Sequence, residues 1–290
     1  MGKIKRITIY TNKIPSDMKL LIISDIHREI NRGGENLKRI KDNVDMQEIS
    51  TILIPGDITN SVNDLENPNF KSQLQEELIA FSQERPTFVS YGNHDLMAKD
   101  GNGHWIPGKK ELLKQTIEEL PNYHFISNGQ KVNQENLSIS ACSPNYGYYE
   151  AKDKKKSERE NKDDYTRIFY ANYDETLFDE QTYNIFLTHE PQSIIRLSKE
   201  QGSCIQPHTD LVISGHMHNG LLPNILQPLA SNRGLISPQM QLFPKYAQGI
   251  HQLGNTTFIM NGPVNARIES SLINNIYGPN ATVVTLQKKR

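Results

Sequence analysis

Residues 19–27 read KLLIISDIH, a short apolar run that ends in an aspartate and a histidine. The run is nearly continuous in its hydrophobicity, which is typical of a strand buried on both faces of a sheet. The same arrangement recurs along the chain, because apolar runs at 51–55, 86–91, 183–188 and 210–214 also lead into short polar motifs. We therefore expect core strands that carry polar side chains at their ends.

Segments with helical spacing lie between these strands, at 36–44, 70–81, 110–120 and 193–197. Strands that alternate with helices predict a layered α/β sheet, and such sheets bind ligands beyond the carboxyl ends of their strands. All the polar motifs fall at that edge. Gly56, Gly92 and Gly215 fit this arrangement, since a sharp exit from a strand favours a residue that tolerates unusual dihedral angles.

Residues after the last motif predict further strands. Residues 250–253 and 256–260 flank Gly254-Asn255, which predicts a hairpin, and 281–286 has the composition of another strand. The stretch 231–249 is rich in Gly, Pro and polar residues and predicts a long loop.

The polar motifs offer nitrogen and oxygen atoms suited to binding metal ions. They are Asp25-Ile26-His27, Gly56-Asp57, Gly92-Asn93-His94-Asp95, Thr188-His189-Glu190 and Gly215-His216-Met217-His218. Imidazole, carboxylate and amide oxygen together suit manganese, iron, zinc or magnesium, and nothing in the sequence chooses among them. Asp25 and His27 would point to the same side of a continuing strand, and Asp57 is the candidate to bridge two ions. His216 and His218 have the same spacing, with Met217 expected to point into packing.

The composition restricts the other possibilities. The 290 residues carry a net charge of −1, which gives no signal for a nucleic-acid partner. No apolar run approaches the ~20 residues of a membrane span, so we expect a soluble, cytoplasmic protein. We expect a single domain over 1–290 with a charged surface insertion near 150–165. The two cysteines, Cys142 and Cys204, have no paired spacing and are expected to be small buried residues.

The order D-x-H, G-D, G-N-H-D, H and G-H-x-H, from Asp25 to His218, resembles that of the calcineurin-like metallophosphoesterase family. The resemblance implies an αββα sandwich, in which two mixed β-sheets are flanked by helices and a dinuclear metal site lies at the strand carboxyl ends. It also implies which residues bind which ion. One ion would be bound by Asp25, His27, Asp57 and His218, and the other by Asp57, Asn93, His189 and His216.

The resemblance further implies hydrolysis of a phosphate ester by a hydroxide that bridges two divalent ions. His94 would be the acid that protonates the leaving group, and Asp95 is expected to hold its imidazole in orientation. Two alternatives stay open. One is a phosphodiesterase or pyrophosphate hydrolase that acts on a nucleotide or a lipid-linked nucleotide. The other is a metal-binding scaffold without catalysis.

Polar residues also lie beside the motifs. Arg28 is a candidate for contact with a substrate phosphate, with an ordinary salt bridge slightly favoured. His104-Trp105 lies in a Gly-rich stretch that could form a wall of the substrate site, although a simple surface loop is favoured.

Relatives can carry an N-terminal anchor, so a soluble domain of a membrane-associated parent also stays open. The oligomeric state is not predicted.

Overall fold

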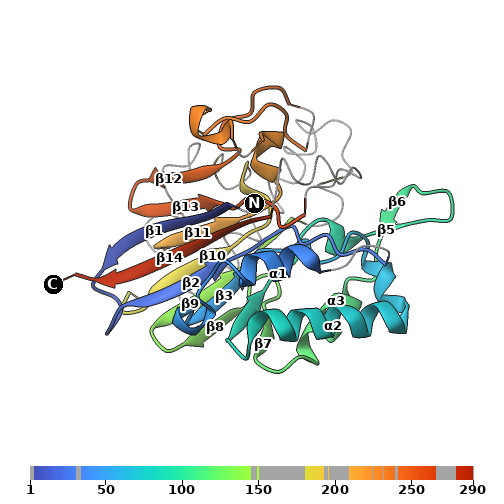
Figure 1. The fold of residues 1–290 in the computed structure, drawn as a ribbon, viewed down its shortest axis with the longest axis horizontal. Helices are drawn as coiled ribbons and strands as arrows, with labels where there is room; N and C mark the ends of the chain where they lie inside the picture. Colours follow the sequence, from blue (N-terminus) through green and yellow to red (C-terminus); the bar gives the residue numbers. More distant parts are fainter. Residues whose placement is uncertain are drawn as a thin grey trace.

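The computed structural model of the chain describes residues 3–30, 34–144, 149, 180–192, 195, 209–223, 225–230, 232–238, 241–265 and 279–289. Two six-stranded sheets are packed face to face (Figure 1). A separate two-stranded hairpin, β5 (Met97–Lys99) and β6 (Trp105–Pro107), projects from the body of the molecule.

The first sheet contains strands from both ends of the chain. Its order is β1 (Lys3–Thr11), β14 (Asn280–Lys288), β2 (Met18–Ile22), β3 (Thr51–Ile54), β4 (Thr87–Val89) and β7 (Tyr123–Phe125). Neighbouring strands are parallel except for β14 and β2, which are antiparallel. The carboxyl ends of β2, β3 and β4 therefore lie at one edge.

The second sheet is also mixed. Its order is β12 (Gly249–Leu253), β13 (Thr256–Met260), β11 (Leu211–Ser214), β10 (Tyr183–Leu187), β9 (Leu137–Ala141) and β8 (Lys131–Gln134). The four central strands are parallel, whereas β12 and β8 pair antiparallel at the two edges. The loop from β12 to β13 is Gly254-Asn255, which confirms the predicted hairpin.

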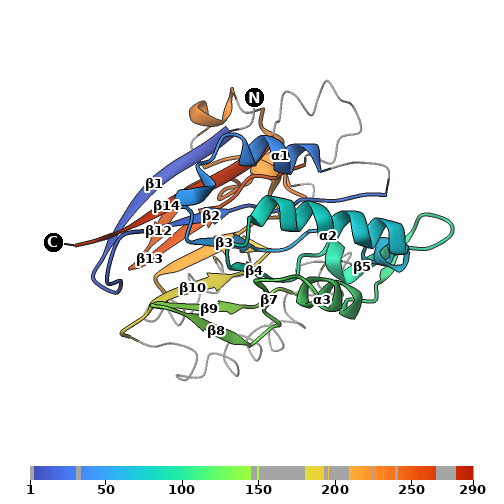
Figure 2. The ribbon, with the colours of Figure 1, turned by 60° about the horizontal axis from the view of Figure 1, so that its bottom comes forward.

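Three helices, α1 (Glu35–Lys41), α2 (Pro68–Ser82) and α3 (Glu111–Glu118), cover the outer face of the first sheet (Figure 2). The start of α2 is encoded locally, since the side-chain oxygen of Asn67 accepts hydrogen bonds from the backbone of Asn69 and Phe70. Pro68 occupies the first turn, where its missing N–H costs nothing. Short 3₁₀ helices are η1 (Met46–Glu48), η2 (Val62–Glu66), η3 (His94–Leu96), η5 (His218–Leu221) and η6 (Gln227–Leu229).

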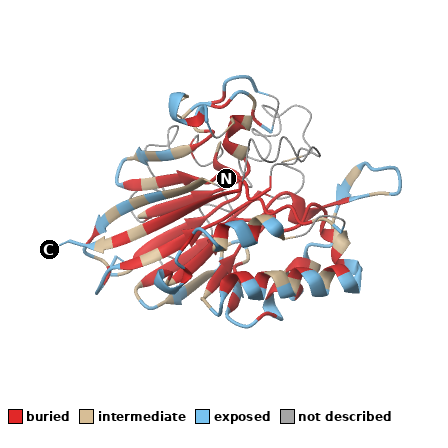
Figure 3. Ribbon diagram, viewed as in Figure 1, coloured by how far each residue is buried: buried red, intermediate tan, exposed pale blue. Residues whose placement is uncertain are grey.

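Side chains of the central strands alternate between two apolar layers. In β3, Ile52 and Ile54 face the helices, while Leu53 packs between the sheets. In β11, Ile213 packs between the sheets, while Val212 lies on the outer face of the second sheet. The central strands are buried on both faces, as Figure 3 shows, which explains their continuous apolar sequences.

The α/β class with two mixed sheets flanked by helices is confirmed, and every expected core strand is present. The expected helix at 193–197 and the charged segment near 150–165 fall almost wholly outside the described residues. The single domain over 1–290 stays a prediction. Within the described part of the chain, no helix is both long and apolar enough to cross a membrane.

Candidate metal centre

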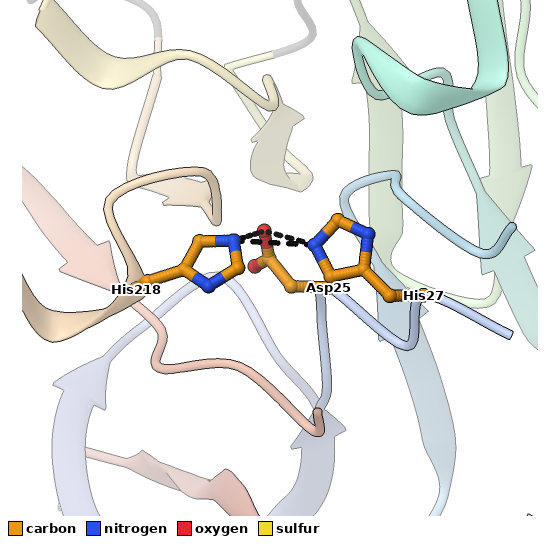
Figure 4. Close-up of side chains that lie close together, drawn as sticks. All are labelled: Asp25, His27 and His218. Atoms are coloured by element: carbon orange, nitrogen blue, oxygen red, sulfur yellow. Dashed lines mark hydrogen bonds and ion pairs between the residues drawn. The ribbon is translucent and has the colours of Figure 1, made fainter. Parts of the chain in front are cut away.

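The loops that follow β2, β3, β4, β10 and β11 bring the predicted ligands together at one edge of the two sheets. The side chains are buried, although 11% of the His218 side chain stays exposed. Asp25, His27 and His218 form one group (Figure 4). Nε2 of His218 lies 3.2 Å from Oδ1 of Asp25 and 3.2 Å from Nε2 of His27.

Asp57 lies between two of the imidazoles. Its Oδ2 is 3.0 Å from Nε2 of His189 and 3.6 Å from Nε2 of His27. Its Oδ1 accepts a 2.8 Å hydrogen bond from the backbone N–H of His94. One oxygen is thus held by the protein while the other faces both imidazoles, which is the placement that a bridging carboxylate requires.

Asn93 and His216 form a further pair. Oδ1 of Asn93 lies 2.9 Å from Nδ1 of His216, and the backbone N–H of His216 points at the Asp25 carboxylate, 3.1 Å from Oδ1. The rings of His216 and His189 meet edge to face with their centroids 5.1 Å apart. All seven predicted metal ligands therefore belong to one connected cluster of side chains.

The backbone conformation at the predicted ligands differs from the expected one. Continued strands were expected to point Asp25 and His27 to the same side, but both residues have positive φ, 53° and 45°. Asp57, His216 and His218 also have positive φ, between 46° and 66°. Left-handed backbone is unfavourable for residues with a Cβ and concentrates at functional sites. The strands end before the ligands, and tight left-handed loops aim the side chains.

Gly92 and Gly215 do not have left-handed backbone. They leave space for neighbouring side chains instead. A Cβ at Gly92 would collide with Oδ1 and the backbone nitrogen of Asp57, and a Cβ at Gly215 would lie 2.5 Å from Oδ2 of Asp25. Only Gly56 among the three has the expected left-handed backbone, with φ of 89°. Only glycine fits at positions 92 and 215, because the carboxylates of Asp57 and Asp25 occupy the adjacent space.

We expect Gly92→Ala to destabilise the protein by about 2 kcal/mol, the cost typical of inserting a methyl group into a packed site. It should also lower the metal content, because the Asp57 carboxylate must move. Urea unfolding and elemental analysis measure both effects. Gly101→Ala is the matched control, since no atom lies within 4 Å of its added Cβ. Equal behaviour of the two variants would contradict this packing argument.

The protonation states of the cluster suit metal binding at every group with a shifted pKa except His189. Burial lowers the pKa of His27 and of His216 well below the usual range, so both rings are neutral. Burial favours a raised pKa for Asp25 and Asp57, but the imidazoles of His218 and His189 outweigh it and hold each carboxyl ionised. Burial also lowers the pKa of His189, yet Asp57 more than compensates and raises it to about 10. Because metal binding must displace this proton, acid should weaken binding.

Buried nitrogen atoms without a hydrogen bond support a fit to metal ions. Nε2 of His189 is buried and makes no hydrogen bond of good geometry, although Oδ2 of Asp57 is 3.0 Å away. Nδ1 of His189 is 2.8 Å from the carbonyl oxygen of Pro55, which leaves Nε2 to face the cluster. Three groups of side chains have ligand atoms that, within each group, lie within 4.8 Å of one another. The groups are Asp25, His27 and His218; His27, Asp57 and His94; and Asp25, Asp57 and His189. These donors fit divalent ions.

The model of the calcineurin-like phosphoesterase family matches residues 18–220 of the chain. The chain belongs to this family. The match begins at β2 and ends just past His218, so it contains every predicted ligand. No curated protein matches the chain at the level of its sequence.

Solved structures show distant likenesses to this calcineurin-like phosphoesterase. A dimetal phosphatase from Danio rerio has a TM-score of 0.49 and 11% identity, with 93% of each chain covered. Phosphopantetheinyl hydrolase from Mycobacterium tuberculosis has a TM-score of 0.44 and 12% identity, covering 92% of this chain and 96% of that one. A purple acid phosphatase from yellow lupin has a TM-score of 0.39 and 17% identity, with 72% of this chain but only 39% of that chain covered. Proteins of one fold act on different substrates, so none of these likenesses specifies one.

In this calcineurin-like phosphoesterase, a backbone carbonyl orients His94. Nδ1 of His94 lies 2.8 Å from the carbonyl oxygen of Asn60, so Nδ1–H donates to this carbonyl and fixes the orientation of the ring. The ring meets His27 edge to face at 4.8 Å and Trp105 at 5.0 Å, measured between centroids. Trp105 thus contacts the motif histidine, although a simple surface loop was favoured for its segment.

Asp95 does not orient the His94 imidazole, so that expectation is wrong. Its carboxylate accepts hydrogen bonds from the backbone N–H groups of Asp57, Ile58, Thr59 and Gly92, at 2.7–3.2 Å. Burial and the nearby Asp57 raise the pKa of Asp95 to about 7, while the N–H donors of Gly92 and Thr59 oppose the rise. Asp95 instead ties the loop after β3 to the loop after β4, and so positions Asp57.

The described polar residues outside the cluster are structural or exposed. Arg28 is buried and pairs with both oxygens of Glu77, each at 2.6 Å, so the ion-pair interpretation holds. The side chain of His104 is 78% exposed, and His124 stacks on Phe88. Cys142 is buried with a free thiol, whereas Cys204 and His208 fall outside the described residues.

Proposed function

We propose that this chain hydrolyses phosphate esters with two divalent metal ions. The observation that carries the proposal is the cluster of buried carboxylates and imidazoles around Asp25 and Asp57. Asp25, His27, Asp57 and His218 would bind one ion, and Asp57, Asn93, His189 and His216 the other. Bound ions would act as Lewis acids toward phosphate oxygens and lower the pKa of a bound water.

Residues beside the cluster would orient Asp57, donate a proton and form a wall of the substrate site. Asp57 is held at one oxygen by the His94 N–H, which leaves the other oxygen directed at the imidazoles. His94 would carry a proton on Nε2 and release it to the leaving-group oxygen, while Nδ1–H stays bonded to the carbonyl of Asn60. Trp105, edge-on to His94, would form the wall beside the leaving group.

A chelator experiment tests this function. The purified protein is stripped of metal, and hydrolysis of nitrophenyl phosphate and bis-nitrophenyl phosphate is measured before and after addition of manganese, iron, zinc or magnesium. We expect activity to disappear on stripping and to return with at least one ion. The preferred ester then distinguishes a phosphatase from a phosphodiesterase. A protein that binds metal without hydrolysing either ester would instead be a scaffold, and full activity without metal would refute the two-ion proposal.

A further inference from the structure

Exposed large apolar side chains are concentrated in one stretch of the chain. Seven of them lie between residues 225 and 250: Ile225, Leu226, Leu229, Leu235, Leu242, Phe243 and Ile250. Ile225 and Leu229 are each 82% exposed, and Phe243 is 61% exposed. We call these seven residues the apolar face. Elsewhere in the described residues the exposed large apolar side chains are single, as with Tyr10 and Ile79. Isolated apolar residues are ordinary on surfaces, whereas a concentration marks an interaction site.

The segment that carries the apolar face has charged side chains of one sign. Residues 211–268 contain no aspartate or glutamate, although the whole chain has 33 acidic residues. Arg233 and Lys245 are exposed within this stretch, and neither forms an ion pair with any residue that the structure describes. The apolar side chains are therefore accompanied by positive charge that no described acidic side chain pairs with.

A hollow beside the apolar face combines these two properties. It has a volume of about 390 Å³, and its walls include Arg233, Lys245, Phe243 and Tyr246. Cationic groups beside aromatic and aliphatic side chains suit a molecule with an anionic head and an apolar body. Lipids at the surface of an anionic bilayer have this character.

The apolar face is attached to the metal centre at two points. The backbone N–H groups of Leu235 and Ile236 donate to the carbonyl of Gly220, at 2.7 and 3.2 Å, two residues after His218. The side-chain amide of Gln192 donates to the carbonyl of Lys245 at 3.0 Å, close in sequence to His189. Whatever binds this face is therefore held next to the ligand loops.

We propose that the apolar face, with Arg233 and Lys245, docks on an anionic lipid surface. Apolar side chains would enter the boundary between headgroups and acyl chains, while the two cations would contact anionic headgroups. Pairing of two copies through this face is disfavoured, because it would juxtapose the cations of both copies with no acidic residue from 211–268 to neutralise them. The docking itself does not depend on hydrolysis, so it can be tested separately from the proposed function.

Vesicle sedimentation tests the proposal with the full chain. Vesicles of phosphatidylcholine alone are compared with vesicles that also contain phosphatidylglycerol, at low and at high salt. We expect the wild type to bind the anionic vesicles, with weaker binding at high salt because exposed charges are screened. The double variant Leu229→Asn/Phe243→Asn should bind about tenfold more weakly, since two anchoring side chains are lost.

Two further variants complete the test. Arg233→Gln/Lys245→Gln should lose the preference for anionic vesicles while it keeps the apolar side chains. Tyr10→Asn/Ile79→Asn is the matched control, because it removes exposed apolar groups outside the face and should bind like the wild type. Circular dichroism verifies that each variant is folded. Failure of the wild type to sediment, equal binding by all the variants, or dimerisation through this face in ultracentrifugation without vesicle binding would overturn the proposal.

Discussion

Replacing Asp57 with asparagine should reduce phosphate-ester hydrolysis by at least about a thousandfold, because a catalytic metal ion contributes several kcal/mol to transition-state stabilisation. The Oδ1 of the new side chain can still accept the His94 N–H, so the loop should keep its conformation. The amide nitrogen, however, would replace the oxygen that faces His27 and His189, and it cannot bind a cation. Elemental analysis and steady-state kinetics measure the two losses.

The exposed substitution Asp42→Asn is the control for Asp57→Asn, since it removes the same charge away from the site. It should leave both metal content and kcat/KM unchanged. Full occupancy of both metal sites in Asp57→Asn would refute the bridging role. Loss of activity with a disordered protein would be recognised by circular dichroism, in which case Asp57→Glu provides a second test of the same oxygen position.

Replacing His94 with asparagine should slow hydrolysis of alkyl phosphate esters by about a hundredfold to ten-thousandfold, the usual contribution of a general acid. Nitrophenyl esters should lose much less, because nitrophenolate is a good leaving group that needs little protonation. The decisive quantity is the loss of rate on alkyl esters divided by the loss of rate on nitrophenyl esters. Both losses are obtained from kcat of the wild type and of the variant at saturating metal concentration.

His104→Asn is the matched control for His94→Asn, because the His104 side chain is 78% exposed. It should affect neither ester. Metal content must be equal in the wild type and His94→Asn, since the His94 ring contacts His27 and its loss could disturb a ligand. An equal loss on both esters at full metal content would show that His94 is not the acid.

The strands could be predicted from the sequence because burial on both faces leaves a simple pattern. Residues 52–54 of β3 and 211–213 of β11 are apolar without interruption, and each belongs to one of three apolar layers. Strand β1 was not predicted, since its burial alternates between intermediate and exposed and its sequence mixes lysine and arginine with isoleucine. It joins the sheet by pairing along its whole length with β14, from the other end of the chain. Such long-range pairing has no local signal.

The orientation of the site residues was harder to predict from the sequence. Asp95 follows His94 in the sequence, which favoured a contact between their side chains, yet the carboxylate turns to the backbone of residues 57–59. The carbonyl of Asn60 orients His94 instead. Every residue has a carbonyl, so a contact of this kind leaves no trace in the residue types. Trp105 reaches His94 through the hairpin of β5 and β6, which also depends on the chain's path.

The sequence by itself determined the class of the fold and which polar side chains gather at the edge of the sheets. Continuous apolar runs require burial on both faces, and the order of the motifs identifies the residues that follow each run. Only the tertiary structure decided how those residues meet. Left-handed backbone at Asp25, His27 and Asp57, space left by Gly92 and Gly215, and carbonyls of Pro55 and Asn60 aim the side chains. These are contacts between distant loops, and their geometry depends on the packed sheets rather than on any local pattern of residues.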